Sequence, residues 1–172
     1  MSLTPVRNLQ LHNQIERVLH APGNYRGGIL EMAIVIDRTY GREAVRVMCA
    51  DIIESCKKQS DIFRNVRLNM VMWGEKEICT QTVASTYIQM GTFFDDYEPE
   101  DADDAKSTEE LMEYLKKFHS RSKLILIVAP DKERFHSVAE PDRLKQAMTP
   151  FLKQKVVMIY PEEIEAGIRL FM

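Results

Sequence analysis

Short apolar runs recur along this chain of 172 residues, and segments long enough for a helix separate most of them. The runs lie at residues 29–37, 66–73, 123–130 and 155–160. The interior of the first run is continuously apolar, which is typical of a strand covered on both faces. Strands that alternate with helices form one mostly parallel sheet with helices on both sides. We therefore predict an α/β fold of the Rossmann-like type, with three layers in the order α/β/α.

Helical patterns occupy the segments around these runs. Residues 42–58 carry a wide apolar stripe opposite a charged face. Ser107 and Glu110 match a capping box, which opens a predicted helix that ends at about His119. The residues that we expect this helix to bury are Leu111, Met112, Leu115 and Phe118. Further helices are predicted over residues 6–20, 141–153 and 161–171.

Residues 76–90 have β character, because β-branched residues recur among them. We predict an antiparallel edge strand or a hairpin in this region. The segment that follows, residues 95–104, is strongly acidic. Such a segment is usually a solvated surface loop, and the alternative is a docking site for a basic partner or a cation.

The chain is long enough for one domain with its own core. We expect a single domain over residues 1–172, with residues 1–28 as an N-terminal helix and turn extension. The net charge of −3 predicts no general affinity for nucleic acid or for an anionic membrane. No run approaches the roughly 20 apolar residues that a membrane span needs, and no signal-peptide pattern opens the sequence. We therefore expect a cytoplasmic protein with no nucleic-acid or membrane partner, and no pattern indicates an oligomeric state.

Acidic residues follow two of the predicted strands. Asp37 ends the first strand, with Thr39 on the turn after it, and Asp131 follows the run at 123–130. The carboxyl ends of parallel strands share one edge of the sheet, where open α/β folds bind ligands and metals. Carboxylate and hydroxyl oxygens suit a hard cation such as Mg²⁺. The alternative is that Asp37 only caps the following turn or helix and that Asp131 is an exposed loop residue.

The segment Val35–Gly41 reads Val-Ile-Asp-Arg-Thr-Tyr-Gly, and a long helical pattern and a second strand follow it. This order resembles the start of a von Willebrand factor A-type domain. That family opens with a strand that ends in an Asp-x-Ser/Thr-x-Ser turn, which is part of its metal-ion-dependent adhesion site. Asp37 and Thr39 match the first two ligand positions, and Gly41 stands where the second serine should be. The resemblance covers roughly residues 29–160 in the order and length of the elements.

The resemblance implies further ligands for a divalent cation such as Mg²⁺. The family has a threonine before a helix, and here Thr108 directly precedes a predicted helix while Thr92, which follows Gly91, is the alternative. The family also has a strand that ends in Thr-Asp-Gly, and Asp131 stands near that position. The implied ligand set is Asp37, Thr39, Thr108 and Asp131.

The resemblance and the absence of a zinc-protease, P-loop or serine-hydrolase motif favour a non-enzymatic protein-interaction module. We assign no catalytic residue, and we expect the partner to be a protein that docks at the edge carrying Asp37 and Thr39, with or without a divalent cation. A second hypothesis is a Mg²⁺-dependent phosphodiesterase or nuclease. Its acidic cluster would be Asp37, Asp95, Asp96 and Asp131. A third is a regulatory or structural subunit that binds partners through its helix faces.

Overall fold

The structure is a computed structural model. It describes residues 30–39, 41–46, 50, 52, 66–84, 92–93, 95–99, 101, 105–119, 122, 124–129, 155–159 and 164–166. The helices predicted over residues 6–20 and 141–153 lie outside these residues. Within them, no helix has the length and apolar character needed to cross a membrane.

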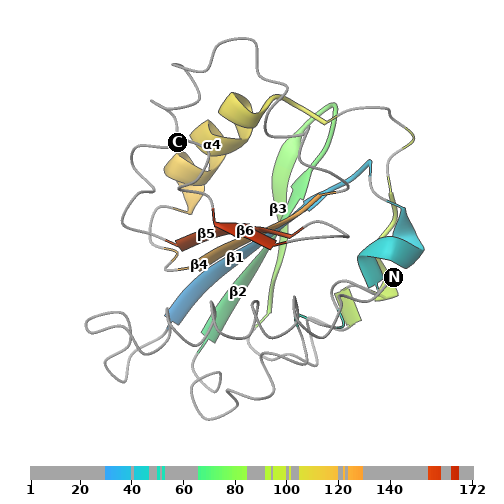
Figure 1. Cartoon of the computed structure of the whole chain (residues 1–172), viewed down its shortest axis with the longest axis horizontal. Helices are drawn as coiled ribbons and strands as arrows, with labels where there is room; N and C mark the ends of the chain where they lie inside the picture. Colours follow the sequence, from blue (N-terminus) through green and yellow to red (C-terminus); the bar gives the residue numbers. More distant parts are fainter. Residues whose placement is uncertain are drawn as a thin grey trace.

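Six strands form one mixed sheet in the order β3-β2-β1-β4-β5-β6 (Figure 1). The four inner strands pair in parallel, and their bounds are Leu30–Asp37 for β1, Val66–Trp73 for β2, Leu124–Val128 for β4 and Lys155–Ile159 for β5. The edge strand β3, Ile78–Ala84, runs antiparallel to β2, as predicted. The α/β class and the mostly parallel sheet are therefore confirmed.

The second edge of the sheet differs from the prediction. Residues 161–171 have a helical pattern, but residues 164–166 form strand β6, which pairs antiparallel with β5. The register joins Val157 to Ala166 and Ile159 to Ile164. Because an uncovered β5 would present a row of unpaired backbone groups, hydrogen bonding across the edge outweighs the local helical periodicity. The predicted helix is wrong at these three residues.

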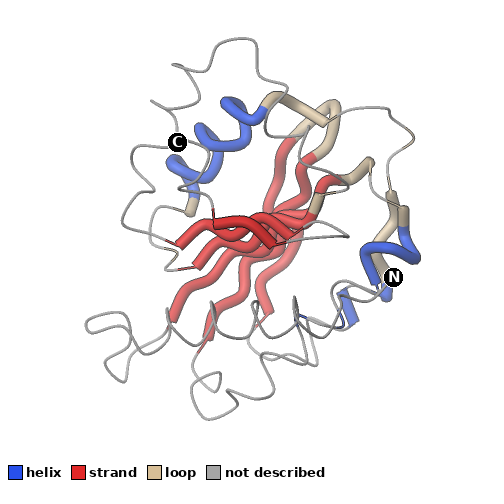
Figure 2. Tube along the Cα trace, viewed as in Figure 1, coloured by secondary structure: helices blue, strands red, loops and turns tan. Residues whose placement is uncertain are grey.

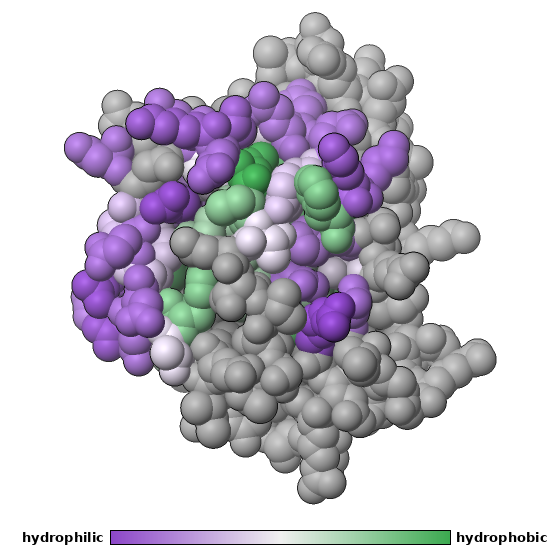
Figure 3. Space-filling model, turned by 180° about the vertical axis from the view of Figure 1, so that it is seen from behind, coloured by the Kyte–Doolittle hydropathy of each residue, from purple (hydrophilic) through white to green (hydrophobic). Residues whose placement is uncertain are grey.

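The core lies on both faces of the sheet, as the continuous apolar runs predict. Helix α4, Thr108–Phe118, covers one face (Figure 2). Its buried side chains pack with alternate strand residues, namely Ala33, Val35, Val71, Ile125 and Ile127. The residues between these, including Met32, Ile34, Met70 and Leu126, point to the other face and are also buried. On the side of the molecule in Figure 3, most described residues are hydrophilic and a smaller hydrophobic group lies among them.

Helix α4 confirms the predicted capping box and corrects the predicted buried face. The Ser107 hydroxyl accepts from the Glu110 amide, and the Glu110 side chain accepts from the Ser107 amide. Leu111, Met112 and Leu115 are buried, but Phe118 is 56% exposed. His119 is buried instead, because it lies four residues after Leu115 and seven after Met112, closer to the centre of the apolar stripe.

Candidate functional site

Asp37 lies at the carboxyl end of β1, beside the end of β2. It stands opposite Trp73 in the parallel register, and the backbone amide of Arg38 donates to the Trp73 carbonyl at 2.9 Å. The strand order reverses between β1 and β4, since β2 lies on one side of β1 and β4 on the other. Open α/β sheets bind ligands at the carboxyl ends of the strands at such a switch point. Asp37 therefore occupies the position in this fold where a ligand is expected.

A tight turn holds Thr39 against the Asp37 carboxylate. The Thr39 amide donates to Asp37 Oδ1 at 2.9 Å, and the Thr39 hydroxyl donates to the same oxygen at 2.6 Å. Asp37 has no exposed surface, and Thr39 is half-buried. The two side chains thus present a carboxylate and a hydroxyl oxygen together at the end of the strand.

These two oxygens are a partial ligand set for a hard cation. Both are donor types that Mg²⁺ accepts, and Mg²⁺ keeps several waters in protein sites. In the described part of the chain, no group of three or more His, Cys, Asp or Glu side chains could hold a metal ion. Asp37 and Thr39 therefore fit a cation only if water or another molecule supplies the remaining ligands.

Gly41 lies two residues after Thr39, where helical residues 42–46 begin. It stands at the position where the family pattern has its second serine, and its carbonyl accepts from the Val45 amide at 3.0 Å as residues 42–46 begin a helix. A Cβ atom built on Gly41 would meet no atom within 4 Å. The local space therefore accepts a serine, although the sequence does not provide one.

The start of α4 lies at the same edge of the sheet. The Trp73 indole donates to the Lys106 carbonyl at 2.7 Å, and the Lys106 amide donates to the Gly74 carbonyl at 2.8 Å. These bonds hold Thr108, the first residue of α4, near the end of β2. The side chain of Thr108 and the whole of Asp131 lie outside the described part, so their predicted roles as ligands stay predictions.

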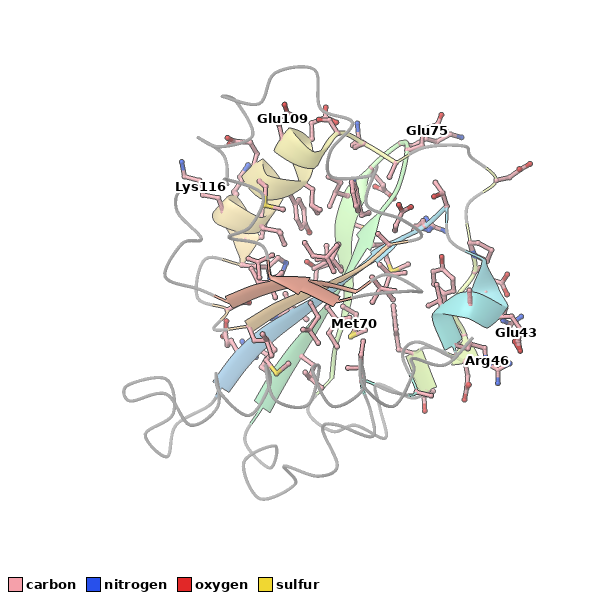
Figure 4. The ribbon with its side chains drawn as sticks, in the orientation of Figure 1. Glu43, Arg46, Met70, Glu75, Glu109 and Lys116 are labelled. Carbon is pink, nitrogen blue, oxygen red and sulfur yellow. The ribbon has the colours of Figure 1, made fainter. Side chains whose placement is uncertain are left out.

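A row of arginines contacts the first part of the acidic segment. Arg38 donates to the Glu98 carbonyl at 3.3 Å, and Arg42 donates to the Asp95 carbonyl at 2.7 Å. Arg42 also pairs with the Glu98 carboxylate at 3.4 Å, and Arg46 with the Asp95 carboxylate at 3.6 Å. Figure 4 shows Arg46 and its neighbour Glu43 on the helical turn after β1, away from the sheet. In the described part of the acidic segment, which was predicted as a solvated loop or a docking site, the side chains of Asp95 and Glu98 are exposed and pair with the chain's own arginines.

Tyr97 anchors the same segment, and sequence reasoning missed it. Its ring is buried, with 3% of the residue exposed, and its hydroxyl donates to the Asp37 carbonyl at 3.5 Å. An aromatic residue inside an acidic run is the signal that could have revealed it. The alternative threonine ligand, Thr92, lies three residues before this segment and is exposed, and its backbone carbonyl accepts from the Asp96 amide at 3.1 Å.

The acidic cluster required for a nuclease is not assembled in the described part of the chain. Asp37 is buried, whereas Asp95 and Asp96 are exposed and Asp95 pairs with Arg46. A nuclease offers basic residues along its substrate path, and the arginines near this edge, Arg38 and Arg42, instead contact residues 95–98. The fourth acid, Asp131, lies outside the described residues.

Two other reactive groups have shifted pKa values. Burial lowers the pKa of His119, although the charge of Glu31 opposes the shift, and its Nε2 lies 2.6 Å from the Thr80 hydroxyl. Burial raises the pKa of the Cys79 thiol, Glu77 raises it further, and Arg38 opposes the shift. A raised pKa leaves little thiolate at neutral pH, which argues against Cys79 as a nucleophile.

The chain matches no protein-family model, and no curated protein matches its sequence.

Proposed function

We propose that this chain is a domain of the von Willebrand factor A type, with three layers, and that it works as a non-enzymatic protein-interaction module. The burial of side chains on both faces of the sheet supports the three layers, because each face needs a cover. The observation that carries the function is the pair formed by Asp37 and Thr39, whose oxygens lie 2.6 Å apart at the switch point of the sheet.

A divalent cation is part of this proposal. Asp37 and Thr39 would hold the ion, and the family resemblance implies that a carboxylate of the partner completes its coordination. The partial ligand set supports this arrangement, because it leaves positions that a second molecule can fill. In this reading the ion supplies a charge bridge between two proteins and takes part in no reaction.

Calorimetric titration with Mg²⁺ and with Mn²⁺ tests the cation. The heats from wild type should fit binding at a single site. Asp37→Asn and Thr39→Val should each lower the affinity for the cation by at least tenfold, or about 1.4 kcal/mol. Asp101→Asn removes the same charge from an exposed position and should behave as wild type. Equal heats from all four proteins would remove the cation from the proposal.

The interaction itself needs a separate measurement. Immobilised wild type should retain a protein from extracts of the cells that express this chain, and a chelator should release it. Thr39→Val should retain markedly less, because it lacks the hydroxyl that faces Asp37. If Thr39→Val and wild type retain the same protein equally, the partner does not dock at this edge.

A further inference from the structure

We propose that Arg38, Arg42 and Arg46 form a binding surface for an acidic, aromatic-containing segment of a partner protein, and that residues 95–98 occupy this surface as an internal competitor. The inference rests on the proposed function in one respect, which is that the partner docks at the edge carrying Asp37. It adds the chemistry of the partner and a means of regulation.

The arginines are spaced to act together. They follow one another at intervals of four residues, and residues 42–46 are helical, so Arg42 and Arg46 lie on the same side of the helix. All three contact the short stretch from Asp95 to Glu98, through two backbone carbonyls and two carboxylates. Guanidinium groups suit this task because each carries several donors in a fixed plane.

The occupant shows what kind of segment the surface accepts. Its sequence is Asp-Asp-Tyr-Glu, with a buried tyrosine between acidic residues. The acidic side chains remain largely exposed, at 69% for Asp95 and 70% for Glu98, so water and salt weaken their pairing with the arginines. Exposed ion pairs, two exposed arginine hydrogen bonds to backbone carbonyls and one aromatic anchor hold the segment, and a similar segment of another protein can make the same contacts.

The same segment contacts the strand end that carries Asp37. The Tyr97 hydroxyl donates to the backbone carbonyl of Asp37, which is itself fully buried. A partner that replaces residues 95–98 on the arginines would therefore break this contact beside Asp37 as it binds. Because residues 95–98 belong to the same chain as the arginines, a free segment must bind against an intramolecular competitor.

A labelled peptide of residues 92–101 (Thr-Phe-Phe-Asp-Asp-Tyr-Glu-Pro-Glu-Asp) tests the exchange by fluorescence anisotropy at low salt. The double variant Asp95→Lys/Glu98→Lys repels the arginines and should bind the peptide at least tenfold more tightly than wild type. Glu113→Lys/Asp101→Lys has the same change in charge at exposed positions and should behave as wild type. Adding Arg42→Glu to the first variant should abolish peptide binding.

Three results would overturn the inference. The first is equal affinity of the peptide for wild type and for Asp95→Lys/Glu98→Lys. The second is binding that survives Arg42→Glu. The third is tight binding of a ten-nucleotide single-stranded DNA without binding of the peptide, which would make the arginines a nucleic-acid surface.

Folding is checked for each variant by circular dichroism. Asp95→Asn/Glu98→Gln keeps the size of both side chains and should show a smaller gain in the same direction. If neither double variant folds, the segment is required for the fold and is not exchangeable, so the proposal fails. The assay contains no divalent cation and leaves Asp37 unchanged, so its outcome is independent of the calorimetric test of the cation.

Discussion

The Thr80 hydroxyl lies 2.6 Å from Nε2 of His119, and this contact joins the edge strand β3 to the residue that follows helix α4. The same hydroxyl lies 2.9 Å from the Tyr114 hydroxyl, so Thr80 bridges the two rings. His119 is buried, and burial lowers its pKa even though the charge of Glu31 opposes the shift. The neutral imidazole is therefore the form that the folded protein favours.

We expect His119 to make the free energy of unfolding depend on pH. Below the unfolded-state pKa of about 6.5, the unfolded chain binds a proton at His119 that the folded chain resists. The stability that depends on neutral His119 is therefore fully present above that pH. It is lost as the pH falls toward the lowered pKa of His119 in the folded chain. Urea denaturation of wild type and His119→Gln at several pH values measures the difference.

Thr80→Val serves as the control for this prediction. It removes the bridging hydroxyl but leaves the imidazole in place, so it should lower stability by about 1–3 kcal/mol while keeping the pH dependence. Parallel pH curves for wild type and His119→Gln would show that His119 titrates alike in the folded and unfolded chains.

Two residues of α4 should respond very differently to truncation. Leu115 is fully buried against the sheet, so Leu115→Ala should cost about 2–5 kcal/mol of unfolding free energy. Phe118 is 56% exposed, and its ring centroid lies 4.7 Å from that of Tyr114, so Phe118→Ala should cost about 1 kcal/mol or less. Urea denaturation gives both losses of unfolding free energy from the shifts in midpoint, provided that the dependence of the free energy on urea concentration is unchanged. A loss for Phe118→Ala as large as that for Leu115→Ala would place Phe118 in the core.

The capping box of α4 should contribute measurably to stability. Ser107→Ala removes the acceptor of the Glu110 amide and should cost about 1 kcal/mol, in the range of 0.5–2 kcal/mol for such caps. Glu113→Ala lies on the exposed side of the same helix and should change stability by less than about 0.5 kcal/mol. Thermal unfolding followed by circular dichroism compares the two, and equal shifts would mean that the cap contributes nothing.

The inner strands were predictable because apolar residues dominate their sequences, and the predicted run 29–37 differs from β1 by one residue. The placement of Asp37 followed from the same reasoning, since parallel strands bring their carboxyl ends to one edge. The errors arose where distant contacts decide the structure. Strand β6 forms because β5 has an edge to pair with, and Tyr97 is buried through contact with a strand 60 positions earlier in the chain. The local periodicity of the sequence predicts neither the pairing of β6 with β5 nor the burial of Tyr97.

Gly41 offers the sharpest test of the proposed cation site. Gly41→Ser restores the second hydroxyl of the family pattern, and a Cβ atom at this position meets nothing within 4 Å. Serine is also well accepted where a helix begins, so the change should not harm folding. We expect Gly41→Ser to bind Mn²⁺ at least tenfold more tightly than wild type, or about 1.4 kcal/mol, because the family resemblance implies a hydroxyl ligand at this position.

Gly41→Ala separates the hydroxyl from the effect of an added side chain on the backbone. It should bind Mn²⁺ no better than wild type in the same calorimetric titration. Combining Gly41→Ser with Asp37→Asn should remove the gain, because the new hydroxyl cannot hold the ion without the carboxylate. If serine and alanine at position 41 give the same Mn²⁺ affinity, the added hydroxyl is not a ligand. The contact between Thr39 and Asp37 would then stabilise the turn after β1 without forming part of a cation site.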